Sequence, residues 1–216
     1  MPAHGEVGTM RVAAIVLAAG GSTRLGQPKQ LLRSEDEPLV VRAVRAAETV
    51  ASPPVIVVTG AETHSIEAAL QALPLAQAIF NPEWETGMGS SIRTGISALL
   101  AVGTPFDAVL LLVCDQPLVR DPLLRQLCAA YRETGKRVIA SEYGDTWGVP
   151  CLFDRTVLPE LAALSGGSGA RSIIEAHRRA GDAAAVAFPS GAFDIDTTAD
   201  WERWQQQSER ARDQTL

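Results

Sequence analysis

A glycine-rich segment near the amino terminus combines backbone freedom with positive charge. Residues 17–29 read LAAGGSTRLGQPK, so Arg24 and Lys29 lie close together in the chain. Glycines directly after a strand let backbone N–H groups approach an anion, and two cations neutralise its charge. The segment is therefore typical of a triphosphate-binding loop, although the glycines alone fit an ordinary turn with surface cations equally well.

Two common phosphate-binding motifs do not fit this segment. A Walker A loop requires Lys and then Ser or Thr directly after its last glycine, whereas Gly26 is followed by Gln27 and Pro28. The dinucleotide fingerprint G-x-G-x-x-G does not fit either, because the glycines stand at positions 20, 21 and 26. A nucleotide bound here is held by a loop of another type.

Two further segments supply carboxylates. Asp115 follows the most apolar run of the chain, and Asp194 and Asp196 lie on the same side of an extended segment. Mg²⁺ binds one or two carboxylates together with substrate phosphates. Each aspartate taken singly also fits a turn or a helix cap. Combined with the glycine-rich loop, they predict a nucleotide–metal site.

The segment ETGMGSSIR at residues 85–93 predicts a helix that begins with small residues. Free N–H groups and the positive end of the helix dipole at such a start can hold an anion. Arg93 lies within the first turn or so of this helix. A flexible loop with a serine cap is the alternative interpretation.

These segments need a regular framework, and strand and helix patterns alternate along the chain. Continuous apolar runs predict buried strands, and apolar residues at helical spacing lie between them. The expected strands are residues 12–17, 55–59, 77–80, 108–113 and 138–140. This order predicts a single-domain α/β fold, a Rossmann-like three-layer sandwich with a mostly parallel sheet and helices on both faces. Ligands bind outside the carboxyl ends of such strands, where the segments above begin.

The pattern is looser in the last third of the chain. Residues 147–153 predict an extended segment and residues 183–188 a strand. Residues 200–212 predict a terminal helix, and we expect Trp201 and Trp204 to pack this helix onto the sheet.

The composition excludes several classes of protein. With 46% hydrophobic residues, the chain is too apolar for a disordered protein. A net charge of −6 argues against a nucleic-acid partner, and 5% aromatic residues argue against a stacking surface for single strands. The longest apolar run, residues 12–19, is too short for a membrane span. We expect a loose tail at residues 1–10 and one cytoplasmic domain at residues 11–212, without a nucleic-acid or membrane partner.

Several reactive residue types are expected to be structural. Cys114, Cys128 and Cys151 form no CxxC pair, so we expect buried or idle thiols in a reducing compartment. His177 shares a helical face with isoleucines and is expected to pack inside the protein. His64 begins a helix and is expected to face solvent.

Six motifs occur in the order in which one enzyme family has them. They are LAAGGSTRLGQPKQLL, GMGSSIR, CDQP, GVPCLF, SGGSGAR and DIDTTAD, and the similarity spans residues 11–204. In these motifs the chain resembles the MobA-like nucleotidyltransferases, and most closely the branch that contains molybdenum cofactor cytidylyltransferase. Two positions depart from the family pattern: Cys114 stands where the family usually has Gly, and Gly167 where Asp is common.

The resemblance implies a role for each matching residue. Asp115 and Asp196 would bind Mg²⁺, with Mn²⁺ as the alternative, and Arg24, Lys29 and Asp115 would be catalytic. The residues implied to bind the nucleotide are Leu17, Ala18, Ala19, Gly20, Gly21, Ser22, Arg24 and Lys29. The residues implied to face a pterin substrate are Gly89, Ser90, Ser91, Arg93, Gly148 and Arg171.

The implied reaction is attack by the terminal phosphate of molybdopterin on the α-phosphate of CTP, with release of pyrophosphate. Alignment of the attacking oxygen and neutralisation of charge supply most of the catalysis in such a transfer, and no protein nucleophile is required. Lys29 and Arg24 would stabilise the charge that builds towards the leaving pyrophosphate. A molybdenum hydroxylase would be the partner that receives the product.

The choice of base and of reaction class rests on the same resemblance. Guanylyl-transferring relatives usually show L-A-G-G and a D-K pair, whereas this chain has Ala19 before Gly20 and Pro28 before Lys29. Sugar-1-phosphate and isoprenoid nucleotidyltransferases share L-A-A-G and P-K but typically have a longer gap between arginine and lysine. Two alternatives remain from other classes: an NAD(P)H-dependent oxidoreductase of small aromatic substrates, which would leave the metal carboxylates idle, and a molybdenum cofactor insertion chaperone.

Overall fold

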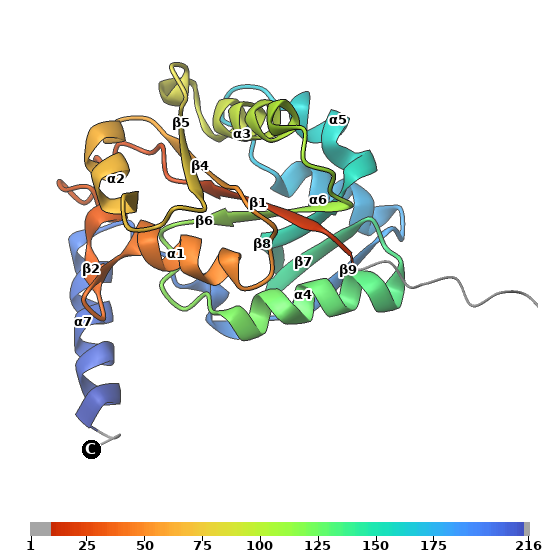
Figure 1. The fold of residues 1–216 in the computed structure, drawn as a ribbon. Coiled ribbons are helices and arrows are strands. Elements are labelled where there is room, and N and C mark those ends of the chain that lie inside the picture. Colours follow the sequence, from red (N-terminus) through yellow and green to blue (C-terminus); the bar gives the residue numbers. More distant parts are fainter. Residues whose placement is uncertain (1–9, 214–216) are drawn as a thin grey trace, which may run out of the picture.

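A seven-stranded sheet crosses the centre of the computed structural model, which describes residues 10–213 (Figure 1). The strands lie in the order β5-β4-β1-β6-β8-β7-β9. Their bounds are Val12–Leu17 (β1), Val55–Thr59 (β4), Ala76–Phe80 (β5), Ala108–Val113 (β6), Val138–Tyr143 (β7), Thr146–Asp154 (β8) and Ala183–Ala187 (β9). The apolar runs therefore predicted β1, β4 and β6 with their observed bounds.

The direction of the strands confirms the mostly parallel sheet. β8 runs antiparallel to both of its neighbours, β6 and β7, and the other paired strands run parallel. β7 and β8 are joined by a tight turn in which Gly144 has a φ of 58°, a conformation that glycine adopts without strain. Because β1, β4, β5 and β6 are parallel, their carboxyl ends meet at one edge of the sheet.

Helices cover both faces of the sheet, which confirms the three-layer α/β prediction (Figure 1). They are α1 (Leu39–Glu48), α2 (Thr63–Leu70), α3 (Met88–Val102), α4 (Asp121–Thr134), α5 (Leu158–Ala162), α6 (Arg171–Arg179) and α7 (Thr198–Asp213). Helices α1, α2 and α4 pack with Ala14 and Val16 of β1, whereas α3, α5 and α6 pack with Ile15 and Leu17. Alternate residues of β1 point to opposite faces, so this strand has to be apolar throughout.

The terminal helix α7 does not pack onto the sheet. Trp204 is 5% exposed and belongs to a small separate cluster with Leu25 and Ile195. Its Nε1 donates a hydrogen bond of 3.0 Å to Oγ of Ser34, in a hairpin of β2 (Arg33–Ser34) and β3 (Glu37–Pro38) that the sequence pattern did not predict. The expectation that the two tryptophans hold α7 against the sheet is therefore wrong, because the helix packs on the hairpin and the glycine-rich segment instead.

The histidines and cysteines have the environments that were expected. His177 is 5% exposed and lies between Glu160 and Asp182, with nitrogen–oxygen distances of 3.0 and 3.3 Å. The side chain of His64 is fully exposed, and all three cysteines are buried and unpaired.

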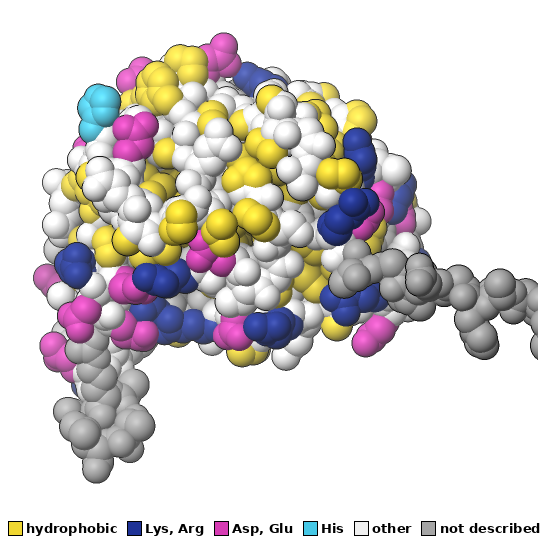
Figure 2. Space-filling view, viewed as in Figure 1, with side chains coloured by type: hydrophobic (Ala, Val, Ile, Leu, Met, Phe, Trp, Pro, Cys, Tyr) yellow, Lys and Arg dark blue, Asp and Glu magenta, His cyan; other side chains and the backbone are white. Residues whose placement is uncertain are grey.

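Three further observations concern the periphery of the protein. No helix among residues 10–213 is both long enough and apolar enough to cross a membrane. The loose tail expected at residues 1–10 lies, apart from Met10, outside the described residues. On the face shown in Figure 2, basic and acidic side chains are interspersed rather than segregated.

Candidate functional site

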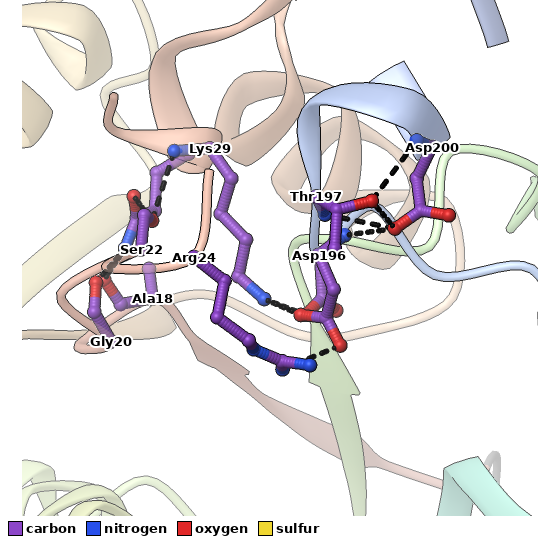
Figure 3. Close-up of polar contacts among 10 residues, drawn as sticks. Ala18, Gly20, Ser22, Arg24, Lys29, Asp196, Thr197 and Asp200 are labelled. Atoms are coloured by element: carbon purple, nitrogen blue, oxygen red, sulfur yellow. Dashed lines mark hydrogen bonds and ion pairs between the residues drawn. The ribbon is translucent and has the colours of Figure 1, made fainter. Parts of the chain in front are cut away.

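The glycine-rich loop leaves the carboxyl end of β1 and is held in place by Gln30. The side chain of Gln30 is 1% exposed, and its Nε2 donates hydrogen bonds to the backbone oxygens of Ala18 (3.0 Å) and Gly20 (2.6 Å). Ser22 adds a second link, because its Oγ accepts a hydrogen bond of 3.0 Å from the backbone N–H of Lys29. These contacts fix the two ends of the loop relative to each other (Figure 3).

Lys29 lies between two carboxylates from distant parts of the chain. Its Nζ is 2.5 Å from Oδ2 of Asp115 and 2.9 Å from Oδ1 of Asp196. The other oxygen of Asp196 accepts a hydrogen bond of 2.8 Å from Nη2 of Arg24. Figure 3 shows the side chains of Arg24 and Lys29 both extended towards Asp196. The structure thus brings together four residues that the sequence analysis had identified in three separate segments.

The charges in this cluster shift the pKa values of its members. Burial disfavours the charged form of Lys29, but the charge and hydrogen bonds of Asp115 and Asp196 outweigh this effect and raise its pKa. Burial also works to raise the pKa of Asp196, yet its contacts with Lys29 and Arg24 bring it below the usual value. Lys29 and Asp196 therefore both remain charged near neutral pH. Asp194 differs, because burial and the charge of Asp115 raise its pKa to about 6.

The start of α7 positions Asp196. Oδ2 of Asp200 accepts hydrogen bonds from the backbone N–H groups of Asp196 (3.3 Å) and Thr197 (2.8 Å). The hydroxyl of Thr197 in turn accepts one from the N–H of Asp200 at 3.2 Å, which completes a capping box. The N–H of Ile195 donates to the backbone oxygen of Asp115 at 3.0 Å. Main-chain contacts therefore hold the two carboxylates beside each other.

A cavity of about 340 Å³ lies next to this cluster. One part of its wall is the loop from Leu17 to Gly21 together with Lys29 and Asp115. Another part comes from the chain after β5 and the start of α3, including Trp84 and Ser91. Most of the residues implied to bind a nucleotide therefore line one cavity. The other two do not line it: Ser22 accepts a hydrogen bond from the backbone N–H of Lys29, and Arg24 donates one to the carboxylate of Asp196.

The two carboxylates fit a divalent cation that arrives with further ligands. Within residues 10–213, no group of three or more His, Cys, Asp or Glu side chains could hold a metal ion by itself. Asp115 and Asp196 nevertheless direct oxygens at the same point, the ammonium group of Lys29. Mg²⁺ usually takes one or two protein carboxylates and completes its shell with phosphates and water. The donor set therefore fits a metal ion bound together with phosphate.

The start of α3 packs against the glycine-rich turn after α5. The N–H of Gly89 donates a hydrogen bond of 3.2 Å to the oxygen of Gly166, and the N–H of Ser90 bonds to the oxygen of Gly87. A Cβ at position 87 would lie 2.6 Å from the Gly166 oxygen, and Gly87 has a φ of 121°, so only glycine fits. The expectation that these N–H groups are free for an anion is therefore wrong, because both have protein acceptors.

The residues implied to face a pterin have protein partners in the structure. The hydroxyls of Ser90 and Ser91 accept hydrogen bonds from Nδ2 of Asn81 at 2.9 and 3.1 Å. Nη1 of Arg93 donates to the backbone oxygen of Leu164 at 2.6 Å. Of these residues, only Ser91 also lines the cavity.

Gly148 lies in β8, and Arg171 is the first residue of α6. Gly148 leaves room for the hydroxyl of Tyr143, which a Cβ at position 148 would meet. Nη2 of Arg171 donates to Oγ1 of Thr146 at 3.3 Å. Neither residue lines the cavity that contains Lys29 and Asp115.

Cys114 is accommodated as a neutral side chain. It is 4% exposed and belongs to the hydrophobic cluster on the α1 face of the sheet. Burial, followed by the charge of the neighbouring Asp115, raises its pKa to about 12. The thiol therefore fills apolar space beside the cavity and adds no charge to it.

Sequence reasoning missed two residues of this site. Gln30 directly follows Lys29, and Trp84 directly precedes the segment at residues 85–93 that had been selected. Two signals could have identified them: Gln30 lies inside the motif LAAGGSTRLGQPKQLL, and Trp84 lies in the segment after the carboxyl end of β5. Neither a buried glutamine nor an indole on a cavity wall has a characteristic spacing in the sequence.

Known proteins with similar sequences have names that indicate several different activities. The sequence model of the MobA-like NTP transferase domain matches residues 14–181. Purine catabolism protein PucB of Bacillus subtilis is 28% identical over 200 residues, which cover 87% of this chain and 93% of that protein. Nicotine blue oxidoreductase of Paenarthrobacter nicotinovorans is 28% identical over 169 residues, covering 74% and 79%. The molybdenum cofactor guanylyltransferase of Vibrio cholerae is 28% identical over 151 residues, covering 69% of each chain.

Solved structures with the same fold include two from mycobacteria. Rv0371c from Mycobacterium tuberculosis, in complex with manganese, is 27% identical and superimposes with a TM-score of 0.70, covering 90% of this chain and 98% of that one. Its homologue from Mycobacterium sp. strain JC1 is 28% identical with a TM-score of 0.79, covering 93% and 98%.

Proposed function

The chain belongs to the MobA-like NTP transferase family, and on that premise we propose that it transfers CMP from CTP to the terminal phosphate of molybdopterin. The proposed reaction requires Mg²⁺, for which Mn²⁺ can substitute, and releases pyrophosphate. A molybdenum hydroxylase is the proposed recipient of the product.

One observation carries this proposal: Lys29 lies between Asp115 and Asp196 at a cavity lined by the glycine-rich loop. A nucleoside triphosphate needs amide donors, fixed cations and a divalent metal ion. The cluster offers fixed cations and two carboxylates that would hold the metal ion, and the adjacent loop can offer amide donors. The relative crystallised with manganese supports a divalent metal in this fold.

The residues of the site bind and neutralise, and none of them reacts covalently in the proposed mechanism. The acceptor phosphate attacks the α-phosphorus of CTP, the bond to the bridging oxygen breaks, and that electron pair leaves with pyrophosphate. Lys29 and Arg24 stabilise the charge that develops on the leaving group. Asp115 and Asp196 would hold the metal ion, which would supply further neutralisation of phosphate charge.

The remaining site residues are proposed to divide between the two substrates. Leu17 to Ser22 hold the nucleotide, and Ser91 lies on the cavity side of the acceptor region. The residues proposed to contact the pterin, directly or through their neighbours, are Gly89, Ser90, Ser91, Arg93, Gly148 and Arg171. The proposed preference for CTP rests on the resemblance of the Ala18-Ala19-Gly20 pattern to the cytidylyl-transferring branch. The pterin acceptor is supported by the relative named molybdenum cofactor guanylyltransferase.

A second candidate function is reduction of a small aromatic substrate by NAD(P)H, which is favoured by the similarity to nicotine blue oxidoreductase. Hydride transfer would give no role to the paired carboxylates or to the cations that face them. A cofactor insertion chaperone, the third candidate, would need the pterin contacts but neither Lys29 nor Asp115. The charged cluster therefore supports the transferase over both.

The test combines binding and turnover. Calorimetric titrations with CTP, GTP and NADH, with and without Mg²⁺, are followed by incubation with molybdopterin and measurement of pyrophosphate. We expect Mg²⁺-dependent binding of CTP, weaker binding of GTP, no binding of NADH, and pyrophosphate release only when the pterin is present. Binding of NADH independent of Mg²⁺, with no heat from CTP, would overturn the proposal in favour of the oxidoreductase.

A further inference from the structure

Trp84 forms part of the cavity wall, and the mechanism above gives it no role. It begins a short 3-10 helix, Trp84–Thr86, directly after β5 and the buried Asn81. Its indole packs partly into the hydrophobic cluster on the α3 side of the sheet. The same cavity wall contains Lys29 and Asp115, so the indole borders the space where the charged cluster acts.

Two loops have a glycine at the position that lies against the indole of Trp84. A Cβ at Gly60, after β4, would be 2.7 Å from Cγ of Trp84 and 2.5 Å from the backbone oxygen of Ala19. A Cβ at Gly21, in the glycine-rich loop, would be 3.2 Å from Cζ3 of the same indole. Contacts this short require glycine at position 60 and leave little tolerance at position 21. Three segments, after β1, β4 and β5, thus fit together around one aromatic ring.

This placement puts a flat apolar surface beside a phosphate-type loop. The indole lies so close to the glycine-rich loop that a Cβ at Gly21 would meet it, whereas Lys29 and Asp115 provide charged groups on the wall of the same cavity. A nucleotide has a matching division, with a planar base at one end and charged phosphates at the other. Stacking of a base on an aromatic side chain is tolerant of base identity, since every base has a π-face, and changes affinity by roughly 5- to 150-fold.

We propose that Trp84 is the side chain against which the base of the bound nucleotide lies. This inference rests on the proposed function only in requiring a nucleotide substrate, and it holds for any base. The contact involves the base alone, so loss of the indole weakens the binding of a nucleoside triphosphate and leaves the binding of inorganic triphosphate unchanged.

The test compares Trp84→Ala and Trp84→Phe with Trp201→Ala, which removes a partly buried tryptophan outside the cavity. Dissociation constants are measured calorimetrically with Mg²⁺ for CTP and for inorganic triphosphate, and the melting temperature of each variant is recorded. We expect Trp84→Ala to weaken CTP binding by about 5- to 150-fold, Trp84→Phe to retain most of the affinity, and triphosphate binding to stay constant. CTP should quench tryptophan fluorescence in the wild type and in Trp201→Ala but not in Trp84→Phe.

Two results for Trp84→Ala would overturn the inference. The variant could bind CTP as the wild type does, or it could lose affinity for CTP and triphosphate equally, which would indicate a structural role. If the wild type binds GTP or NADH but not CTP, the proposed function fails and the same variants are tested with the nucleotide that binds. If the wild type binds CTP and Trp84→Ala is unaffected, the inference fails and the proposed function stands. Absence of any nucleotide binding would overturn both.

Discussion

At the scale of single residues, Lys29 compensates two carboxylates that would otherwise repel each other. Its side chain is 16% exposed and that of Asp115 is 18% exposed, so water screens their interaction only in part. The chain has one other lysine, Lys136, whose Nζ bonds to the backbone oxygen of Gly181 away from the site. The protein therefore contains a matched control for its own candidate catalytic lysine.

We expect Lys29→Met to lower kcat for nucleotidyl transfer by about 10²- to 10³-fold, because a fixed cation facing the developing phosphate charge is lost. Lys136→Met should leave kcat unchanged. Steady-state measurement of pyrophosphate release checks both variants, and circular dichroism establishes that they are folded. Wild-type turnover in Lys29→Met would remove this lysine from the mechanism.

Gln30 offers a second prediction at this scale. Gln30→Ala leaves the oxygens of Ala18 and Gly20 without their donor, so we expect the free energy of unfolding to fall by about 1–3 kcal/mol. Affinity for CTP should fall as well, since the loop loses the link between its ends. Gln27→Ala, at an exposed position of the same loop, is the control. Urea denaturation and nucleotide titration measure both effects, and equal behaviour of the two variants would contradict the prediction.

At the scale of elements, the amino-terminal end of α7 positions the carboxylate of Asp196 rather than packing against the core. The capping box of Thr197 and Asp200 fixes the backbone of Asp196, and Ile195 bonds to the end of β6. Trp204 then anchors the helix on the β2–β3 hairpin. The last element of the chain thus completes a site that begins at the first strand.

The capping box makes stability depend on pH. Hydrogen bonds from Thr197 lower the pKa of Asp200 to about 2, whereas an unfolded aspartate has a pKa of about 3.9. The folded state therefore binds this proton less tightly than the unfolded state. The stabilisation is fully present above about pH 4 and is lost as the pH falls towards 2.

We therefore expect Asp200→Asn to flatten the dependence of the free energy of unfolding on pH between about pH 4 and 2. Thr197→Ala should cost about 1 kcal/mol at neutral pH, because the helix loses its cap. Both variants should also lower kcat, since Asp196 loses its backbone support. Urea titrations from pH 2 to 7 supply the measurement, and parallel curves for the wild type and Asp200→Asn would refute the assignment.

At the scale of the whole molecule, the site joins parts of the chain that are far apart in sequence. Lys29 is separated from Asp115 by 86 residues and from Asp196 by 167. They meet because β1 and β6 are neighbours in the sheet and α7 returns to their carboxyl ends. A ligand that bridges these segments therefore stabilises the fold as a whole.

We expect CTP and Mg²⁺ together to raise the melting temperature by about 5–10 °C at a ligand concentration of 100 times the dissociation constant. This follows from a stabilisation of about 2.7 kcal/mol and a shift of about 2–4 °C per kcal/mol for a chain of this size. EDTA should abolish the shift, since Asp115 and Asp196 would hold a metal ion that neutralises the phosphate charge. Scanning calorimetry measures it, and a shift that survives EDTA would contradict a metal-dependent site.

The sequence by itself determined the strands of the central sheet, the three-layer class and the positions of the glycine-rich loop and the carboxylates. Continuous apolar runs such as residues 12–17 fit only strands that are covered on both faces, and the glycines after them mark the carboxyl ends. Strand formation and the position of the following turn are local properties of the chain, and the local residue pattern predicts them.

Only the tertiary structure decided which of these residues meet. The ion pairs of Lys29, the contact of Gly87 with Gly166, the indole of Trp84 over Gly60 and the docking of Trp204 on the hairpin all join distant segments. Such contacts depend on the order of strands in the sheet and on the path of the loops between them. No periodicity within one segment encodes that order, because it is set by packing the whole chain into one core.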